Sequence, residues 1–387
     1  MPELTGRLVD TGTAVRLRID DGTIAEIAAP DHDTDLWLAP GLVDLQVNGY
    51  AGHDVNTDDV DAGVVGGLVR SLWAAGVTSV CPTIVTGSER RITRALRAVV
   101  EARAADPLVR HAIPCVHVEG PHIADADGPR GAHDAAQLRP PDVAEFHRWQ
   151  AAGEGIVGIV TLAPERPGAL EYIAEVSRTG VVAAIGHTAA EPSDIIAAAD
   201  VGARLSTHLG NGAHLNLRRH PNYIWEQLAD DRLAASFIAD GHHLPASVLT
   251  VMVRAKGVER SILISDATEL AGMPPGRYET PVGGPVELSA DGRLALAGSQ
   301  LLAGAVRPLL DCVAWTARHT EIGLRAAVQM ATANPARLLA PAGPARGTLR
   351  VGAAGDVVAF RVDAATGRLD VDTTVARGVV VHRGGTR

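Results

Sequence analysis

Carboxylate and imidazole side chains recur in this sequence directly after short apolar runs of strand character. Glu119 ends the segment 115–119, where valines alternate with polar residues and Gly-Pro follows. His187, His208 and Asp266 end later apolar runs in the same way. One glutamate and two histidines, with a fourth position open for water, form the ligand set of a catalytic zinc site. An aspartate on a neighbouring strand can take a proton from that water, so the pattern predicts metal-dependent hydrolysis.

Each of these residues also has a purely structural explanation. A buried Glu119 is costly unless it is paired, and its partner could be an arginine as well as a metal ion. A single histidine at a strand end is usually a capped or buried structural residue, and Asp266 next to Thr268 could cap a turn. The recurrence of acid and imidazole groups at the same end of four strands favours a shared site. The structural explanation is kept for His53, His117, His122 and His214.

An alternation of strands and helical segments would place these residues on one face. Barrel strands are expected at 42–47, 78–85, 115–119, 155–162, 181–187, 204–208, 234–239 and 261–266. Amphipathic stretches rich in Ala and Leu, such as 60–75, 90–104 and 245–255, separate them. This order predicts an α/β fold, a (β/α)8 TIM-type barrel whose strand ends form one active-site face. A doubly wound open sheet is the weaker alternative, because no Gly-rich dinucleotide turn follows the first strand.

The two ends of the chain have a different pattern, with short strands and turns. Strands are expected at 6–10, 14–19 and 23–27, with an Asp-Gly hairpin signal at 21–22, and again at 356–362 and 378–382. We expect residues 1–38 and 347–387 to build one small β-sandwich domain. Residues 39–346 would form the hydrolase domain.

Composition and charge exclude several classes of protein. The chain has 387 residues, of which 46% are hydrophobic and 21% charged, and this is typical of a globular protein. Its net charge of -10 argues against nucleic acid as a partner. No apolar run approaches the length of a membrane span, and the segment Met1–Leu4 has no signal-peptide character.

Cysteine and lysine usage add two expectations. Cys81, Cys115 and Cys312 form no close pair, so a reduced cytoplasmic setting is favoured over a disulfide framework or a zinc knuckle. Lys256 is the only lysine, and we expect it at an exposed helix end. A Schiff-base mechanism or a lysine bridging two metals would have to use this residue, and neither is expected.

A set of short motifs occurs in a fixed order along the chain: 40–49 (PGLVDLQVNG), 118–121 (VEGP), 131–133 (GAH), 186–188 (GHT), 207–209 (THL), 239–241 (ADG), 265–268 (SDAT), 296–299 (LAGS) and 334–336 (NPA). This set resembles the motifs of the N-acetylglucosamine-6-phosphate deacetylases, which belong to the amidohydrolase superfamily. They extend over nearly the whole chain, and the set is specific although no single motif is.

This resemblance implies roles for individual residues. Glu119, His187 and His208 match the metal ligands, Asp266 the catalytic acid–base, and His133 a histidine that hydrogen-bonds the substrate amide. The phosphate and sugar contacts match Asn211, Arg219 and His243, with backbone N–H groups around Gly212 as further donors. The resemblance also implies a barrel-plus-sandwich fold, a homodimer, and a small amino-sugar phosphate as substrate.

Two departures from the wider superfamily refine these expectations. Gln46 and Asn48 stand where many amidohydrolases have the His-x-His pair of a second metal, and neutral amides are poor zinc ligands. We therefore expect one divalent ion per chain, with zinc the first choice. The segments 210–214 and 218–222 also differ from the usual family pattern, which concerns substrate identity more than reaction type.

The expected activity is metal-dependent deacetylation of N-acetylglucosamine 6-phosphate to glucosamine 6-phosphate and acetate. A deacetylase of another N-acyl amino sugar, phosphorylated or not, is the nearest alternative. A nucleobase or cyclic-amide amidohydrolase is disfavoured by the missing His-x-His. A non-catalytic sugar-binding paralogue would be expected to lack a ligand or the acid–base residue, and the sequence retains both.

Overall fold

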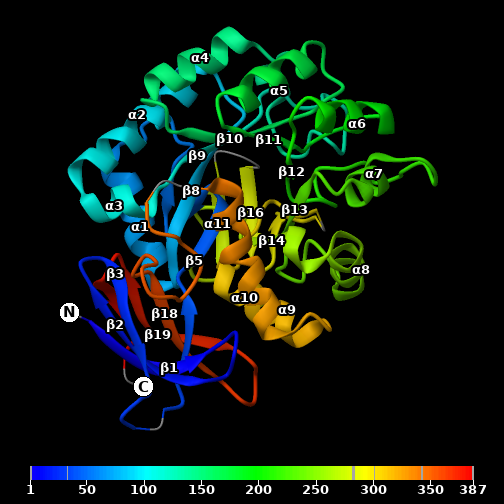
Figure 1. The fold of residues 1–387 in the computed structure, drawn as a ribbon. Helices are drawn as coiled ribbons and strands as arrows, with labels where there is room; N and C mark the ends of the chain where they lie inside the picture. Colours follow the sequence, from blue (N-terminus) through cyan, green and yellow to red (C-terminus); the bar gives the residue numbers. More distant parts are fainter. Residues whose placement is uncertain (1, 33, 281–283, 300, 341–342, 386–387) are drawn as a thin grey trace.

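A closed barrel of eight parallel strands forms the larger part of the molecule (Figure 1). This computed structural model describes residues 2–32, 34–280, 284–299, 301–340 and 343–385. The strands are β5 (Leu42–Val47), β8 (Val77–Val85), β9 (Val116–Glu119), β10 (Val157–Leu162), β11 (Val182–Ile185), β12 (Leu205–Ser206), β13 (Ala234–Ile238) and β14 (Ser261–Ile264). The ring closes where Asp266 N–H donates to the Gln46 carbonyl at 3.0 Å and Val47 bridges Ala267 in parallel. The predicted (β/α)8 barrel is confirmed.

Successive side chains along each barrel strand point alternately to the inside of the barrel and to the layer beneath the helices. Val116 and Val118 of β9 pack in the large core shared with the helices, while Cys115, just before β9, belongs to a separate apolar cluster made mainly of barrel-strand residues. Cys81, on the neighbouring strand β8, lies in the same cluster, with its sulfur 3.5 Å from that of Cys115. The two cysteines are therefore neighbours in space although they are 34 positions apart in the sequence, because strand pairing joins distant residues.

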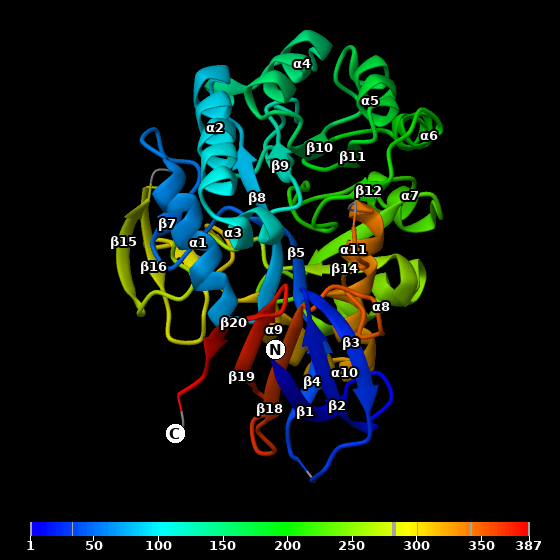
Figure 2. The ribbon, with the colours of Figure 1, turned by 60° about the vertical axis from the view of Figure 1, so that its left-hand side comes forward.

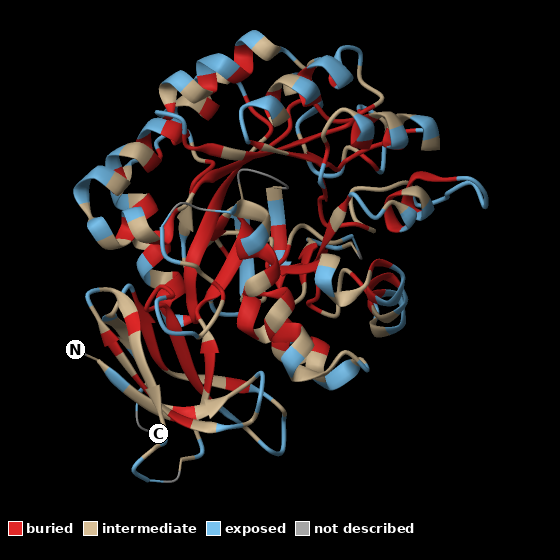
Figure 3. Ribbon diagram, viewed as in Figure 1, coloured by how far each residue is buried: buried red, intermediate tan, exposed pale blue. Residues whose placement is uncertain are grey.

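Helices cover the outside of the barrel, with their apolar faces turned inward (Figure 3). In α2, Ser88 accepts a hydrogen bond from Arg91 N–H as N-cap, and Ile92, Leu96 and Val99 are buried along one face. The helices are α1 (Ala62–Ala74), α2 (Glu89–Ala105), α3 (Pro107–Ala112), α4 (Val143–Ala152), α5 (Ala169–Arg178), α6 (Pro192–Asp200), α7 (Tyr223–Ala229), α8 (Ala246–Lys256), α9 (Leu309–His319), α10 (Gly323–Met330) and α11 (Ala333–Leu339). In the described part of the chain, none has the length and apolarity needed to cross a bilayer.

The two chain ends share one sheet, and Figure 2 shows the blue N-terminal strands beside the red C-terminal strands. Its strands are β1 (Glu3–Leu8), β2 (Ala14–Asp20), β3 (Thr23–Ala28), β4 (Trp37–Pro40), β18 (Val357–Val362), β19 (Leu369–Ala376) and β20 (Val379–Arg383). Strand β4 joins the two halves, pairing with β1 on one side and β18 on the other. Leu17 and Ile24 from the N-terminal half pack with Val357 and Val375 from the C-terminal half in one core. Residues 386 and 387 of the predicted terminal segment lie outside the described residues.

Several strands were not predicted from the sequence, among them β4 and β19 of the terminal sheet. A three-stranded antiparallel sheet follows β14, and a short hairpin follows β5. These strands are β15 (Gly276–Thr280), β16 (Gly284–Leu288) and β17 (Leu294–Leu296), and β6 (Gly49–Tyr50) with β7 (His53–Asp54). They are short and interrupted by Gly and Pro, so their apolar alternation is weak.

Lys256 contradicts the expectation of an exposed position. Its relative exposure is 0%, and its Nζ donates to the carbonyls of Gln227 and Asp230, each at 2.7 Å. These carbonyls lie at the C-terminal end of α7, where helix carbonyls lack partners within the helix. Burial lowers the pKa of Lys256 to about 8. The lysine thus joins α8 to the end of the preceding helix.

Candidate active site

Residues from three barrel strands converge on one oxygen of a buried carboxylate. Glu119 ends β9, and His187 and His208 lie just after β11 and β12. Glu119 Oε1 is 2.8 Å from His208 Nε2 and 3.4 Å from His187 Nε2. All three residues are buried, with relative exposures of 3% to 7%. The structure therefore brings together the three residues whose positions suggested a metal site.

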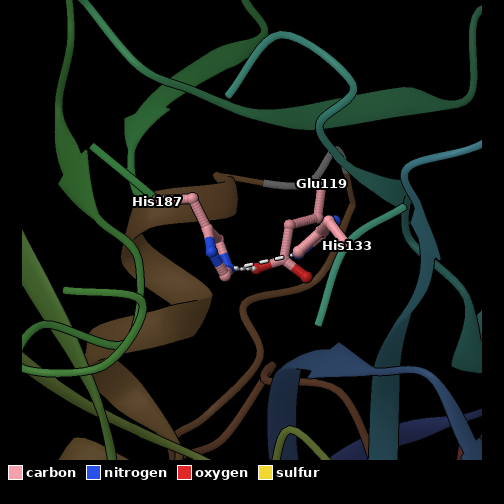
Figure 4. A group of neighbouring side chains, drawn as sticks. All are labelled: Glu119, His133 and His187. Carbon is pink, nitrogen blue, oxygen red and sulfur yellow. Dashed lines mark hydrogen bonds and ion pairs between the residues drawn. The ribbon is translucent and has the colours of Figure 1, made fainter. Parts of the chain in front are cut away.

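His133 adds a third imidazole, and Figure 4 shows that it and Glu119 both face the His187 ring. The ligand atoms of Glu119, His133 and His187 lie within 4.8 Å of one another, as a metal-binding group requires. His208 is not in that group, but its Nε2 is closer to Glu119 Oε1 than that of His187. The described side chains therefore offer four candidate ligands around one point.

The hydrogen bonds of His187 fix which ring nitrogen is free. Its Nδ1 lies 2.8 Å from the Pro129 carbonyl oxygen, which can only accept, so Nδ1 carries the proton. In the neutral ring Nε2 therefore presents a lone pair to the space beside Glu119 Oε1. A histidine that donates one ring N–H to a carbonyl and presents the other nitrogen is the usual form of a metal ligand. The donor set thus fits a divalent cation.

The charge state of Glu119 also suits a cation. Burial by itself raises the pKa of a carboxyl, but the two imidazoles beside Glu119 favour its ionised form and outweigh this effect. The pKa of Glu119 is consequently held well below its usual range, and the group stays ionised. His208 Nδ1 is buried and has no hydrogen-bond partner among the described residues. An ionised carboxylate and two imidazoles form a ligand set that is typical of zinc sites.

Asp266 lies just past the end of β14, beside the cluster. Its Oδ1 accepts a hydrogen bond from Asn48 Nδ2 at 2.9 Å. Burial, followed by the negative charge of Glu119, raises the pKa of Asp266 to about 6. A carboxyl poised in this way can take up and release a proton near neutral pH.

The two amides that replace a second pair of metal ligands are both engaged as donors. Gln46 Nε2 donates to Glu119 Oε1 at 2.9 Å, and Asn48 Nδ2 donates to Asp266. Each amide therefore orients one carboxylate of the site. The number of ions that the site binds stays a prediction.

His133 is held in place by a threonine. Its Nδ1 lies 2.7 Å from Thr86 Oγ1, and its Nε2 lies 3.2 Å from His187 Nε2. Burial lowers the pKa of His133 to about 3, so the ring is neutral. Because His187 Nε2 is unprotonated and accepts from His133 Nε2, His133 Nδ1 accepts from Thr86 Oγ1, and Nε2 carries a proton that it can donate to a ligand.

Three of the site residues have a left-handed backbone, which non-glycine residues rarely adopt. His187, His208 and Asp266 have φ values of 51°, 29° and 49°. At each of these residues the backbone changes direction just after its strand ends. Strain of this kind persists where surrounding contacts hold it, and it concentrates at functional sites.

The residues expected to hold the sugar and phosphate are only partly brought together. Asn211 and Gly212 follow His208 directly, and a Cβ on Gly212 would lie 2.7 Å from His187 Nδ1, so close approach requires glycine here. His243 Nδ1 is 2.7 Å from Asp240 Oδ2, and Nε2 has no hydrogen-bond partner among the described residues. Arg219 is exposed on the loop between β12 and α7. It lines a surface pocket of about 330 Å³ with Leu217, Arg218, His220, Asn222, Ile224 and Trp225, and none of these described lining residues belongs to the cluster.

Comparison with known proteins identifies the wider family. The model of the amidohydrolase family matches residues 37–381, which is most of the chain. The chain belongs to this family. Amidohydrolases are metal-dependent, in agreement with the converging glutamate and histidines.

Individual relatives narrow the comparison. This amidohydrolase is 34% identical to the N-acetylgalactosamine-6-phosphate deacetylase of Escherichia coli O157:H7, over 89% of this chain and 90% of that protein. It is 30% identical to the N-acetylglucosamine-6-phosphate deacetylase of Bacillus subtilis (strain 168), over 91% of this chain and 86% of that protein. A solved structure of the Mycobacterium smegmatis N-acetyl-D-glucosamine-6-phosphate deacetylase, a mutant in complex with that sugar phosphate, is 31% identical. It superposes with a TM-score of 0.85 and covers 98% of each chain.

Several contacts of the site were not anticipated from the sequence. Asn48 as the partner of Asp266 and Thr86 as the partner of His133 join different positions around the barrel, whereas Asp240 contacts His243 within one loop. Asp240 lies in the 239–241 motif at a strand end, and this position was the available signal. Nothing in the sequence near Thr86 indicates its contact with a histidine 47 positions away.

Proposed function

We propose that this amidohydrolase removes the acetyl group of N-acetylglucosamine 6-phosphate, giving glucosamine 6-phosphate and acetate. The observation that carries the proposal is the convergence of Glu119, His187 and His208 beside Asp266 at the barrel mouth. Deacetylases of amino-sugar 6-phosphates among the relatives support the substrate class.

Glu119, His187 and His208 would hold one divalent cation, for which zinc is proposed. Such a cation supplies a water of lowered pKa and polarises an amide carbonyl. Asp266, oriented by Asn48, takes the proton from the attacking water and delivers it to the leaving amine. His133 donates from Nε2 to the carbonyl oxygen, where negative charge develops.

The phosphate end of the substrate needs cationic and N–H donors. His243, whose Nδ1 is paired with Asp240, would donate from Nε2, and backbone N–H groups near Asn211 and Gly212 would add further donors. Arg219 offers a planar fork that suits two phosphate oxygens. Because Arg219 is exposed and lines a separate pocket, its contact requires movement of the 210–222 loop or a second copy of the chain.

A homodimer is also proposed, because apolar side chains are exposed near the loop that carries Arg219. Leu215, Leu217 and Trp225 have relative exposures of 90%, 39% and 52% and lie on or next to the loop that carries Arg219. Exposed apolar side chains gathered in one place are typical of a contact surface.

We also propose that residues 1–38 and 347–387 form one domain and 39–346 the other. A cytoplasmic setting is supported by three buried cysteines without a disulfide.

A second candidate substrate is N-acetylgalactosamine 6-phosphate, on which the Escherichia coli O157:H7 relative acts by name. The two sugars differ only in the orientation of the hydroxyl at carbon 4. The metal cluster is indifferent to that difference, since it acts on the acetamide at carbon 2.

Acetate release measured on four sugars tests both proposals. The substrates are the 6-phosphates of N-acetylglucosamine and N-acetylgalactosamine and the two unphosphorylated parents, each with metal-free and zinc-loaded protein. Highest kcat/KM on the first sugar, dependent on zinc, supports the main proposal. A preference for the galacto sugar transfers it to the second candidate, and no acetate release from any of the four refutes both.

A further inference from the structure

A chain of buried hydrogen bonds crosses the barrel one layer below the candidate metal ligands. His117 Nδ1 lies 3.2 Å from the Leu45 carbonyl oxygen, and His117 Nε2 lies 2.7 Å from Thr161 Oγ1. Thr161 Oγ1 lies 2.7 Å from Thr207 Oγ1. The three side chains are at most 3% exposed. The chain links four barrel strands or strand ends: β5, β9, β10 and the end of β12.

The direction of every bond follows from its one fixed end. The Leu45 carbonyl can only accept, so His117 Nδ1 carries the proton and the neutral ring accepts at Nε2. Thr161 must therefore donate its hydroxyl proton to His117, and its oxygen is left to accept from Thr207. The donor and the acceptor of each hydrogen bond are therefore fixed, so removal of one hydroxyl leaves a buried partner without its hydrogen bond.

A glycine makes the contact between the two threonines possible. Strand β11 lies between β10 and β12, and Gly186 at its end stands between Thr161 and Thr207. A Cβ added to Gly186 would lie 2.8 Å from Thr161 Cγ2 and 2.8 Å from Thr207 Cβ. The φ of Gly186 is not in the left-handed region, so the glycine is required here for space and not for backbone freedom.

The chain connects directly to the residues proposed as ligands. His117 is two residues before Glu119 on the same side of β9, and Thr207 is next to His208. Gly186 is next to His187. Metal affinity depends on ligand separations within a few tenths of an ångström. A relative shift of β9 and β12 would therefore change the 2.8 Å separation of Glu119 Oε1 and His208 Nε2.

We infer that His117, Thr161 and Thr207 are positioning residues that set the spacing of Glu119 and His208 for the cation. This inference rests on the proposed metal site and extends it to a layer that touches neither metal nor substrate. It replaces the purely structural explanation of His117.

Zinc affinity, measured by competition with a chromophoric chelator, tests the inference without using turnover. Thr161→Val keeps the shape of the side chain and removes the hydroxyl, and we expect zinc to bind about 10- to 100-fold more weakly. Thr161→Ser retains the hydroxyl and should restore most of the affinity. Thr207→Val should weaken binding too, but add little in the Thr161→Val background, because Thr207 acts through Thr161.

Thr374→Val is the matched control, since Thr374 is also fully buried and donates its hydroxyl to the Trp73 carbonyl at 2.8 Å in the terminal sheet. It should lower stability while leaving zinc affinity unchanged. Equal loss of affinity in the control, or unchanged affinity in both Thr161→Val and Thr207→Val, overturns the inference. If Thr161→Val does not fold, Gly186→Ala tests the same contact and should also weaken zinc binding; unchanged affinity in it overturns the inference. Failure of the unmodified protein to bind any divalent ion would instead refute the proposed function.

Discussion

Replacement of Asp266 by asparagine tests the proposed acid–base directly. A positioned general base or acid contributes about 10²- to 10⁴-fold, and Asp266 is proposed to act in two successive proton transfers. We therefore expect kcat to fall by at least this range, which corresponds to about 3–5 kcal/mol of transition-state stabilisation.

The structure makes asparagine the appropriate substitution. Asp266 has a φ of 49°, and asparagine tolerates this left-handed conformation better than other non-glycine residues. The amide oxygen of the variant can still accept from Asn48 Nδ2, as the carboxylate does at 2.9 Å. Asp266→Ala would lose both features, so it serves as the comparison that mixes structural damage with loss of the base.

Acetate release from N-acetylglucosamine 6-phosphate gives kcat and KM, and elemental analysis of the same sample gives zinc content. The expected result is a large fall in kcat with zinc near the level of the unmodified protein. Loss of zinc together with activity would refute the reasoning, because Asp266 would then be chiefly a ligand. A fall of less than about tenfold would refute it too, since a base with two roles cannot be so dispensable.

Three further predictions concern the metal, the phosphate and the buried lysine. Elemental analysis should find about one zinc per chain, and two tightly bound ions per active chain would contradict this. The variants His187→Ala and His208→Ala should each lose zinc and activity but remain folded. Arg219→Ala should raise KM for the 6-phosphate sugar about 10- to 1000-fold, the loss of roughly 1.5–4 kcal/mol, with Arg218→Ala as control. Equal turnover of phosphorylated and unphosphorylated sugars by the unmodified enzyme would exclude the phosphate site. Lys256→Met should lower the free energy of unfolding by about 1–3 kcal/mol at pH 7, measured by urea denaturation, because two helix-end carbonyls lose their donor. Burial lowers the pKa of Lys256 from 10.5 to about 8, so the unfolded chain binds more protons between these values, and stability should rise with pH there; the same rise in Lys256→Met would exclude this lysine as its cause.

The barrel and the neighbourhood of the site followed from local features of the sequence. All eight predicted barrel strands are present, because each is a short apolar run ended by glycine or by polar residues. Glu119, His187, His208 and Asp266 could be expected to meet, since the carboxyl ends of parallel barrel strands share one face. Their catalytic and ligand roles stay predictions.

Contacts between distant residues were decided only by the tertiary structure. Lys256 was predicted at an exposed helix end, but it is fully buried, because its Nζ donates to a carbonyl at the end of α7. The Pro129 carbonyl fixes the tautomer of His187 from 58 positions away, and Gly186 lets two threonines of non-adjacent strands touch. A sequence specifies the period of each element and its ends, because these depend on neighbouring residues. Which proton each buried group carries depends on partners that only the closed barrel brings together.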